Sequence, residues 1–451
     1  MKSAAGHFKK GDVLYGRMRS YLNKVYRADF EGACSAEFIV FPGSEHLNSD
    51  YLKYLLHDRR FVNFSASKAS GDRPRVDIDD IGSYQFWLAP KAEQDRIADK
   101  LDQLFSQIEK GEENLRRVEA LVKRYRQSVL KAAVTGELTR DWRAAVGGQA
   151  ETGEDLLQRI LKARREAWEA AELAKMKAKG KTPKNDSWKQ KYKEPEPPDT
   201  SELPNLPEGW VWASVGQLGF VSGGLTKNAK RAGLPLKRPF LRVANVYANE
   251  LRLDEVHKIG LQVQEADKVT LQAGDLLIVE GNGSAEQIGR VAIWDGSIPD
   301  CTHQNHLIKA RLVEPQLQKM ALAWLLSPHG RDCIRLVASS TSGLHTLSIS
   351  KVSGLPVPVP PLAELPMIFD YLEAAETSAQ NVNALLEREV SRVSSLRQST
   401  LRAAFSGQLI PQDPEDEPAS TLLERIAAEQ EALALSKPKR GRRKKSKEAA
   451  E

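Results

Sequence analysis

The chain has 451 residues, of which 41% are hydrophobic and 28% are charged, enough for two or three globular domains. No run of 18 apolar residues occurs and the first residues lack the apolar core of a signal peptide, so we expect a cytoplasmic protein without a membrane span. The three cysteines, none of them in a CxxC pair, exclude a disulfide framework and are expected to be reduced thiols.

The first part of the chain, residues 1–91, is expected to form a small β-rich domain with a helix over 49–58. Two turn-rich segments, 15–24 and 64–76, carry arginine, lysine and small polar side chains. These side chains bind phosphates, and arginine also reads guanine in the major groove. Taken singly, each of them fits a solvated surface residue better than a nucleic-acid contact.

A long helix is expected over 92–136. Ten positions follow each other in steps of four and three residues, and nine of them are apolar, which is the pattern of a coiled-coil seam. The seam positions are Ile97, Leu101, Leu104, Ile108, Gly111, Leu115, Val118, Val122, Tyr125 and Val129. Gly136 then marks the end of the helix. Such a helix spans about 65 Å, so its apolar seam needs a partner.

Residues 137–202 are polar and charged, and we expect a short helix near 153–178 followed by a linker. A second β-rich part is predicted over 203–362. Its short β-branched runs are 238–247, 275–281, 290–296 and 306–313, and a helix follows at 317–327. Its turn-rich segments carry arginine, asparagine, glutamine and histidine, the side chains that reach base edges.

A second long helix is expected over 363–407, with a weaker seam that is richer in alanine and ends at Gly407. Two such helices in one chain most simply bury each other's seams, although a partner protein could instead cover both. Residues 408–451 form a charged tail. Its stretch 437–447 holds eight cations and no acid, and is expected to be a disordered polycation that binds nucleic acid or aids solubility.

The chain contains an internal repeat, with two copies offset by 271 residues. "YRQSVLKAAVTGEL" from Tyr125 matches "LRQSTLRAAFSGQL" from Leu396, and "PKAEQDRI" from Pro90 matches "PPLAELPMI" from Pro360. "KGDVLYG" from Lys10 likewise resembles "AGDLLIV". The sequence therefore predicts an α+β protein with two β-rich mixed domains and two long helices that form a coiled coil.

Motifs of catalysis are missing from the sequence. It has no GxxxxGK[ST] loop and no Asn-Pro-Pro-aromatic tetrad for adenine methylation, and "GNGS" at 281–284 reads as a turn. "CTHQNH" at 301–306 has histidines at a spacing that could suit a metal, but no second cluster supplies further ligands. We therefore expect no metal site, no catalytic residue and no cofactor bound by this chain.

The paired helix motifs, together with "LPNLPEGWVWASVGQL" from Leu203, resemble the specificity subunit of type I restriction-modification systems over almost the whole chain. The resemblance implies two target recognition domains, 1–91 and 203–362, each reading one half of a split double-stranded DNA site. It implies a spacer of two antiparallel helices, 92–136 and 363–407. It also implies docking of two methyltransferase subunits and of restriction subunits. S-adenosylmethionine, ATP and Mg then belong to those partners.

The first copy departs from the family pattern at its start. The second copy begins near Pro207, about 66 residues before Ala273, whereas only nine residues precede Lys10. We therefore expect the N-terminal part of the first recognition domain to be missing, which leaves open a truncated, inactive subunit. The sequence is also compatible with a non-catalytic coiled-coil scaffold whose globular domains bind protein, and less well with a fused methyltransferase-specificity protein.

Loop position and side-chain chemistry select the candidate DNA contacts. They are Arg17, Arg19, Arg73 and Arg75 in the first part, and Lys227, Arg242, Asn245, Asn282, His303, Gln304 and His345 in the second.

Overall fold

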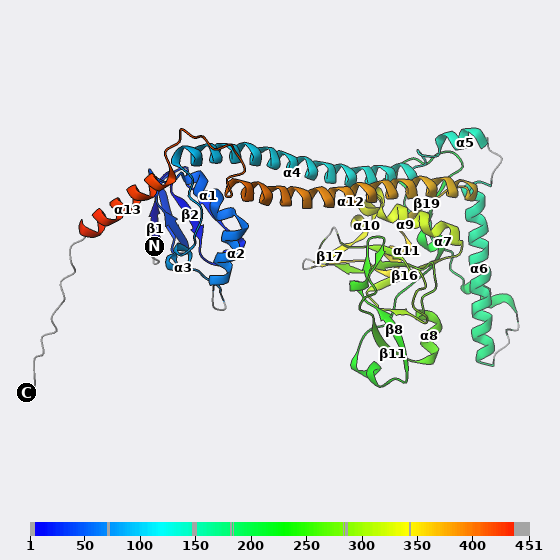
Figure 1. Cartoon of the computed structure of the whole chain (residues 1–451). Helices are drawn as coiled ribbons and strands as arrows, with labels where there is room; N and C mark the ends of the chain where they lie inside the picture. Colours follow the sequence, from blue (N-terminus) through cyan, green and yellow to red (C-terminus); the bar gives the residue numbers. More distant parts are fainter. Residues whose placement is uncertain are drawn as a thin grey trace, which may run out of the picture. The chain divides into compact units, whose positions relative to one another are not determined.

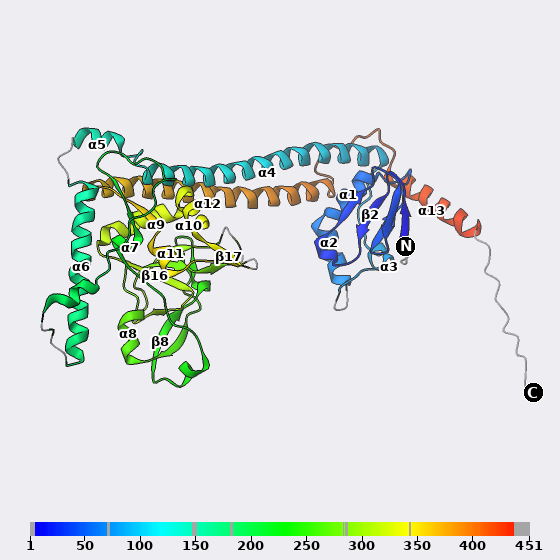
Figure 2. The same ribbon diagram turned by 180° about the vertical axis from the view of Figure 1, so that it is seen from behind.

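The computed structural model describes residues 5–69, 73–146, 151–180, 183, 185–282, 284, 287–341 and 344–436. The chain divides into two compact units (Figure 1 and Figure 2). Unit 1 comprises Met1–Glu119 and Ala384–Glu451, and unit 2 comprises Ala120–Asn383. Within the described ranges, no helix is long and apolar enough to cross a membrane. The basic stretch at 437–447 lies outside the described residues.

Two long helices each contribute to both units, so each unit contains a stretch of both. They are α4 (Lys91–Val134) and α12 (Leu365–Ala404). Each ends at the predicted glycine, since Gly136 has φ +72° and Gly407 has φ +71°. After each glycine the next amide donates to the carbonyl five residues back, the hydrogen bond of a left-handed glycine stop.

In unit 1 the beginning of α4 packs against the end of α12, so the two helices run antiparallel. Ile97, Leu101 and Phe105 of α4 are buried in one cluster with Leu401 and Ala404 of α12. Beside this seam the Arg397 guanidinium lies 5.1 Å from the centre of the Phe105 ring and 3.6 Å from the carboxylate of Glu112.

In unit 2 the end of α4 meets the beginning of α12 in the same antiparallel sense. Ala133 and Val134 of α4 share a core with Ile368 of α12. Arg126 of α4 donates a 2.8 Å hydrogen bond across the helices to Glu376. The predicted pairing of two antiparallel helices is therefore confirmed within each unit.

The predicted seam is wrong in its details away from the helix ends. Tyr125, placed in the seam by the sequence, and Leu396, its equivalent in the second copy, are 48% and 51% exposed, whereas Phe105, one residue beyond a predicted seam position, is 6% exposed. The reason is that an α-helix has 3.6 residues per turn, so its apolar face drifts by about 20° per heptad relative to a strict seven-residue repeat.

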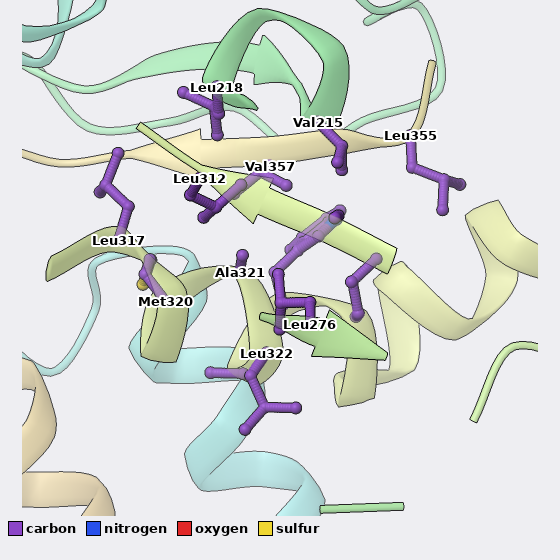
Figure 3. Close-up of a cluster of buried hydrophobic side chains, with 14 of the residues drawn as sticks. Val215, Leu218, Leu276, Leu312, Leu317, Met320, Ala321, Leu322, Leu355 and Val357 are labelled. Carbon is purple, nitrogen blue, oxygen red and sulfur yellow. The ribbon is translucent and has the colours of Figure 1, made fainter. Parts of the chain in front are cut away.

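The core of unit 2 is a four-stranded antiparallel sheet in the order β14-β12-β16-β7. These strands are β7 (Gly219–Ser222), β12 (Leu276–Val279), β14 (Val291–Ile293) and β16 (Leu307–Leu312). Helix α9 (Gln318–Leu326) packs beside the sheet and is followed by α10 (Pro328–Val337). Figure 3 shows the buried cluster, with side chains of α9 on one side of the strands and Val215 and Leu218 on the other.

The remaining elements of unit 2 surround this sheet. Strand β6 (Val211–Ser214) pairs with β19 (Pro356–Val359), and both contact α6 (Gly153–Ala178). A smaller sheet has the order β11-β8-β15. Its strands are β8 (Leu236–Leu241), β11 (His257–Leu261) and β15 (Thr302–His303). The other elements are α5 (Arg140–Val146), α7 (Val215–Leu218), α8 (Val263–Val269), α11 (Ile349–Ser353), β9 (Val246–Tyr247) and β10 (Glu250–Leu251).

Unit 1 contains a three-stranded sheet in the order β3-β2-β5 and a separate pair β1-β4. The strands are β1 (Ala5–Phe8), β2 (Val13–Gly16), β3 (Val25–Arg27), β4 (Gly32–Ser35) and β5 (Phe38–Phe41). The helices are α1 (Ser49–His57), α2 (Arg59–Lys68), α3 (Ile78–Gly82) and α13 (Ala419–Ser436). Tyr15 of β2 and Phe61 of α2 are buried at the centre of its core.

The internal topologies of the two units agree with the predicted duplication. The central strands β2 and β12 each pair antiparallel with the two strands that follow them in the main sheet. Helices α1, α2 and α3 then follow in unit 1, and α9, α10 and α11 follow in the same order in unit 2. Unit 2 has in addition the elements from β6 to α8, for which the described part of unit 1 contains no counterpart.

Candidate nucleic-acid interface

A pair of loops in unit 1 gathers the four arginines that the sequence singled out. The segment after β2 runs antiparallel to the segment before α3, with Met18 bridged to Arg75. The backbone N–H of Arg19 donates to the Pro74 carbonyl at 2.8 Å, and that of Val76 donates to the Arg17 carbonyl at 3.1 Å. The structure therefore brings Arg17, Arg19, Arg73 and Arg75 onto two adjacent strands of backbone.

These arginines differ in their surroundings. Arg17 donates through Nε to the Val76 carbonyl at 3.2 Å and forms an ion pair with Asp77. Arg75 donates to Glu37 at 2.6 Å. Arg19 and Arg73 are exposed, and Arg19 has a φ of +53°, in the left-handed region. A non-glycine residue is uncommon there and such conformations gather at functional sites.

Unit 2 pairs its own loops at the matching place. Directly after β12, strand β13 (Gly281–Asn282) pairs antiparallel with β18 (Leu344–Thr346), which in turn pairs with β17 (Ser339–Thr341). In this register Asn282 lies opposite His345. The structure therefore joins these two predicted residues, which are far apart in the sequence, at the position where unit 1 has its arginines.

A second group of predicted residues in unit 2 lies around the small sheet. The backbone N–H of Leu225 donates to the His303 carbonyl at 2.8 Å, and Leu225 forms a bridge with Gln304. This pairing places the loop that carries the exposed Lys227 beside the partly buried Gln304. Arg242 is partly buried and forms an ion pair with Glu255 at 3.4 Å.

Two of the predicted contacts are buried, so the expectation of exposed loop side chains is wrong for them. Asn245 is 3% exposed and caps its own turn: it accepts from the Arg242 N–H at 2.8 Å and donates to the Arg252 and Glu255 carbonyls. His303 is fully buried, with Nδ1 2.9 Å from the Leu307 carbonyl oxygen, and burial lowers its pKa to about 4. Both side chains serve the fold.

Comparison with known proteins shows similarity to one family over most of the chain. The type I restriction modification DNA specificity domain matches residues 3–117. The EcoKI specificity subunit of Escherichia coli K12 is 27% identical over 430 residues, covering 92% of this chain and 77% of the relative. The Escherichia coli EcoDI specificity subunit is 26% identical, covering 97% and 88%. Over most of its length the chain is similar to the specificity subunits of type I restriction-modification systems.

A solved structure has the same fold. A chain from a study of complex assembly and conformational transition of the type I system superimposes with a TM-score of 0.61. The two share 16% identity, and the match covers 91% of this chain and 85% of the other. The predicted α+β class, with mixed domains and two long helices, is confirmed.

Two acidic residues that sequence reasoning missed shape the arginine group of unit 1. Glu37 and Asp77 hold Arg75 and Arg17 in defined positions. Glu37 comes from a segment far from Arg75 in sequence, so no local pattern could have revealed its part. Asp77 follows directly on the loop, but its partner Arg17 is also far away in the sequence, so local spacing does not reveal this pair either.

The histidine-rich segment of unit 2 has no metal-ligand geometry in the described ranges, where no group of three or more His, Cys, Asp or Glu side chains could hold an ion. His306 instead lies 2.9 Å from the carboxylate of Glu280. Cys301 is fully buried, and burial raises its thiol pKa to about 12. Such a thiol stays protonated and unreactive at neutral pH.

Proposed function

We propose that this chain reads a bipartite double-stranded DNA site, one half with each unit, and that it carries no catalytic group. The observation that supports this most is a pair of adjacent loop segments in each unit, which we call the platform of that unit. In unit 1 the platform is the segment after β2 with the segment before α3, and in unit 2 it is β13 with β17 and β18. In both units the loop after the central strand pairs with the loop before a short helix, and both platforms carry residue types that bind nucleic acid. Two platforms with the same backbone arrangement but different side chains suit a DNA site whose two halves differ in sequence.

The residue types give each platform its own chemistry. Unit 1 offers arginines, whose guanidinium fork matches the two acceptors of guanine or a phosphate. Unit 2 offers Asn282 and His345, with Lys227 and Gln304 on a second loop. Asparagine and glutamine pair with adenine in the major groove. Each good base contact is worth about 1–3 kcal/mol of discrimination against the wrong base.

Partner docking is the second part of the proposal. Tyr125 in unit 2 and Leu396 in unit 1 occupy equivalent positions of the repeat, and each is about half exposed. Leu121, one helical turn before Tyr125, is 58% exposed and extends this apolar surface in unit 2; contiguous exposed apolar surface marks protein interaction sites. Two matching faces suit two copies of a methyltransferase subunit, to which restriction subunits are added. In this proposal S-adenosylmethionine, ATP and Mg are held by those partners.

Methylation mapping tests the proposal. The chain is expressed with the methyltransferase subunit of its own system, and methylated adenines are mapped across the genome. We expect one split motif, in which Arg73→Ala relaxes one half and His345→Ala relaxes the other. Lys319→Ala, a substitution on α9 outside both platforms, serves as the control. A continuous motif, or a motif that neither platform variant changes, would contradict the proposal.

A further inference from the structure

The outer half of α6 in unit 2 belongs neither to the core nor to a platform. Its first turns bury Leu156 and Ile160 in the core of the unit. From Lys162 onwards the side chains of the helix are exposed or half-buried. We call residues 162–180, together with residues 185–193, the basic arm.

Aromatic rings hold the two parts of the basic arm together. The ring centres of Trp168 and Trp188 lie 6.1 Å apart in a stacked arrangement, and the Tyr192 ring lies 5.2 Å from that of Trp168. Arg164 donates a 2.6 Å hydrogen bond to the Tyr192 hydroxyl, and its guanidinium lies 5.0 Å from the centre of the Phe220 ring in β7. The arm is therefore a folded part of unit 2.

Lysine dominates the charge of the basic arm. The arm contains nine Lys and Arg side chains against four Asp and Glu. Its ion pairs involve Arg165, Lys175 and Lys189. Five exposed lysines form no ion pair with any described residue, and these are Lys162, Lys177, Lys179, Lys191 and Lys193. The surplus positive charge of the arm is therefore open to a ligand.

The basic arm lies away from the platform of unit 2. Figure 1 and Figure 2 show α6 and β17 on opposite sides of this unit. Bases that are read at β13, β17 and β18 therefore lie apart from the arm. A duplex that runs across unit 2 reaches the arm only with the part that flanks the half-site.

The second copy of the repeat carries a cationic stretch at the corresponding place. "LLQRI" from Leu156 in α6 resembles "LLERI" from Leu422 in α13, and each helix leads into a lysine-rich stretch, at 175–193 and at 437–447. The two stretches share their charge but otherwise differ in sequence. A charge that recurs without a fixed order of residues suits a polyanion, because phosphates attract any nearby cation. Lysine binds a phosphate as a point charge, whereas the arginines of a platform present a planar fork.

We propose that the basic arm binds the phosphate backbone of double-stranded DNA outside the half-site that unit 2 reads. This inference rests on the proposed reading of DNA by the platforms, and it adds a contact that does not depend on base sequence. Phosphate contacts position a duplex but carry no sequence information. The arm should therefore contribute to affinity and to its salt dependence, and leave the choice of bases to the platforms.

Duplexes of two lengths test the basic arm. The full-length chain, in complex with the methyltransferase subunit of its own system, is titrated against fluorescein-labelled duplexes that contain the mapped site, and fluorescence anisotropy gives the Kd. One duplex ends at the half-site that His345→Ala relaxes, and the other continues for about 20 base pairs beyond it. We expect the longer duplex to bind about tenfold more tightly at low salt, because it adds phosphates for the arm.

Matched lysine variants locate this effect. Lys191→Gln with Lys193→Gln removes two exposed charges of the arm. This pair should weaken binding of the longer duplex about tenfold and reduce the slope of log Kd against log salt by about 1.8, which is about 0.9 for each lost contact. The shorter duplex should be unaffected. Lys258→Gln with Lys268→Gln removes the same charge from another exposed part of unit 2 and should change the Kd of neither duplex.

A second pair on the helical side of the arm, Lys177→Gln with Lys179→Gln, should act in the same way as the first. All four lysines are exposed, so their substitution keeps the fold. Because the contacts are to phosphates, both pairs should leave the preference for the cognate site over an altered site unchanged.

The outcomes separate this inference from the proposed function. Equal affinities for the two duplexes, or arm variants that behave like the control pair, would overturn the inference while the site preference stands. If neither His345→Ala nor Arg73→Ala changes the site preference, the proposed function fails and the inference fails with it. If the arm variants weaken binding of a partner subunit but keep the advantage of the longer duplex, the arm is a protein-binding surface and the inference is also overturned.

Discussion

Glu93 and Glu364 occupy the same position in the two halves of the molecule, yet their surroundings are opposite. Glu364 is buried among Thr139, Arg143 and Trp210, all of which donate to it. Glu93 is buried beside a pocket with no donor among the described residues, and burial raises its pKa. The comparison shows that the same residue in two copies of a repeat can have different roles, because the neighbouring segments that supply its hydrogen-bond donors differ.

The largest effect should come from removing each glutamate in turn. Glu364→Leu leaves Arg143 and the indole N–H of Trp210 without their acceptor, which costs about 3–5 kcal/mol for a broken buried pair. Glu93→Leu should leave the stability of unit 1 unchanged or raise it, because burial of this carboxylate outweighs the favourable charge of Arg96 and raises its pKa. Urea unfolding followed by tryptophan fluorescence reports unit 2, and hydrogen exchange reports unit 1.

The pH dependence of the Glu93 substitution sharpens this contrast. The folded-state pKa of Glu93 is raised, so the wild-type carboxyl favours folding below its unfolded pKa, and this contribution is lost as the pH rises through the raised value. The advantage of Glu93→Leu should therefore be largest at neutral pH and shrink on acidification. An advantage that grows at low pH would contradict this account.

The two glycine stops should differ in their tolerance of alanine. Left-handed backbone costs a residue with a Cβ about 1–2 kcal/mol, which is the whole expected loss for Gly407→Ala. Gly136→Ala should lose more, since its Cβ would lie 2.6 Å from the ring of Pro207. Thermal unfolding of the two variants measures which one loses more stability. Equal losses would contradict the prediction and show that Pro207 does not restrict a side chain at position 136.

A smaller effect is expected at the DNA platforms. Arg19→Ala and Arg73→Ala should each cost about 1–3 kcal/mol of binding if the arginine reads a base, and relax the specificity at one position. If it holds a phosphate, binding should weaken equally for all sequences and the salt dependence should fall. Binding assays with a cognate duplex and a duplex altered in one half separate the two. The same substitutions should leave the other half unaffected.

The smallest effect at neutral pH concerns His303. Burial lowers its folded-state pKa from 6.5 to about 4, so the unfolded chain binds more protons between these values and stability falls as the pH drops through this window. Asparagine places an amide near the position of Nδ1 and does not titrate. His303→Asn should match the wild type at pH 7 and flatten the loss of stability between pH 6.5 and about 4. Unfolding midpoints at several pH values measure this slope.

The sequence predicted the elements whose pattern is local. The helix expected near 153–178 is α6, and the strands expected around 275–281 and 306–313 are β12 and β16. Gly136 and Gly407 were readable as helix ends because a left-handed stop requires glycine at that position. For the platforms, the sequence predicted the residues from their loop positions. It did not predict that Asn282 pairs with His345, because this pairing depends on tertiary contacts.

The predictions that depended on three-dimensional context were less accurate. Asn245 and His303 are polar residues in turn-rich segments, and nothing local distinguishes a turn cap or a buried ring from a DNA contact. Whether Glu93 is covered could not be predicted, because its own segment closely resembles that of Glu364. The seam failed around Tyr125 because the assumed period of about 3.5 residues accumulates error along a long straight helix.

The ion pairs of Arg17 with Asp77 and of Arg75 with Glu37 have a consequence for thermodynamic measurements. An arginine that is already paired with a carboxylate must leave that carboxylate to bind a DNA phosphate. The freed carboxylate then attracts cations, so the net number of counterions released on binding is smaller. The number of ions released on binding should therefore be smaller than the number of arginines in contact. A salt titration of DNA binding that counted phosphate contacts from ion release alone would miss the arginines that already form ion pairs in the free protein.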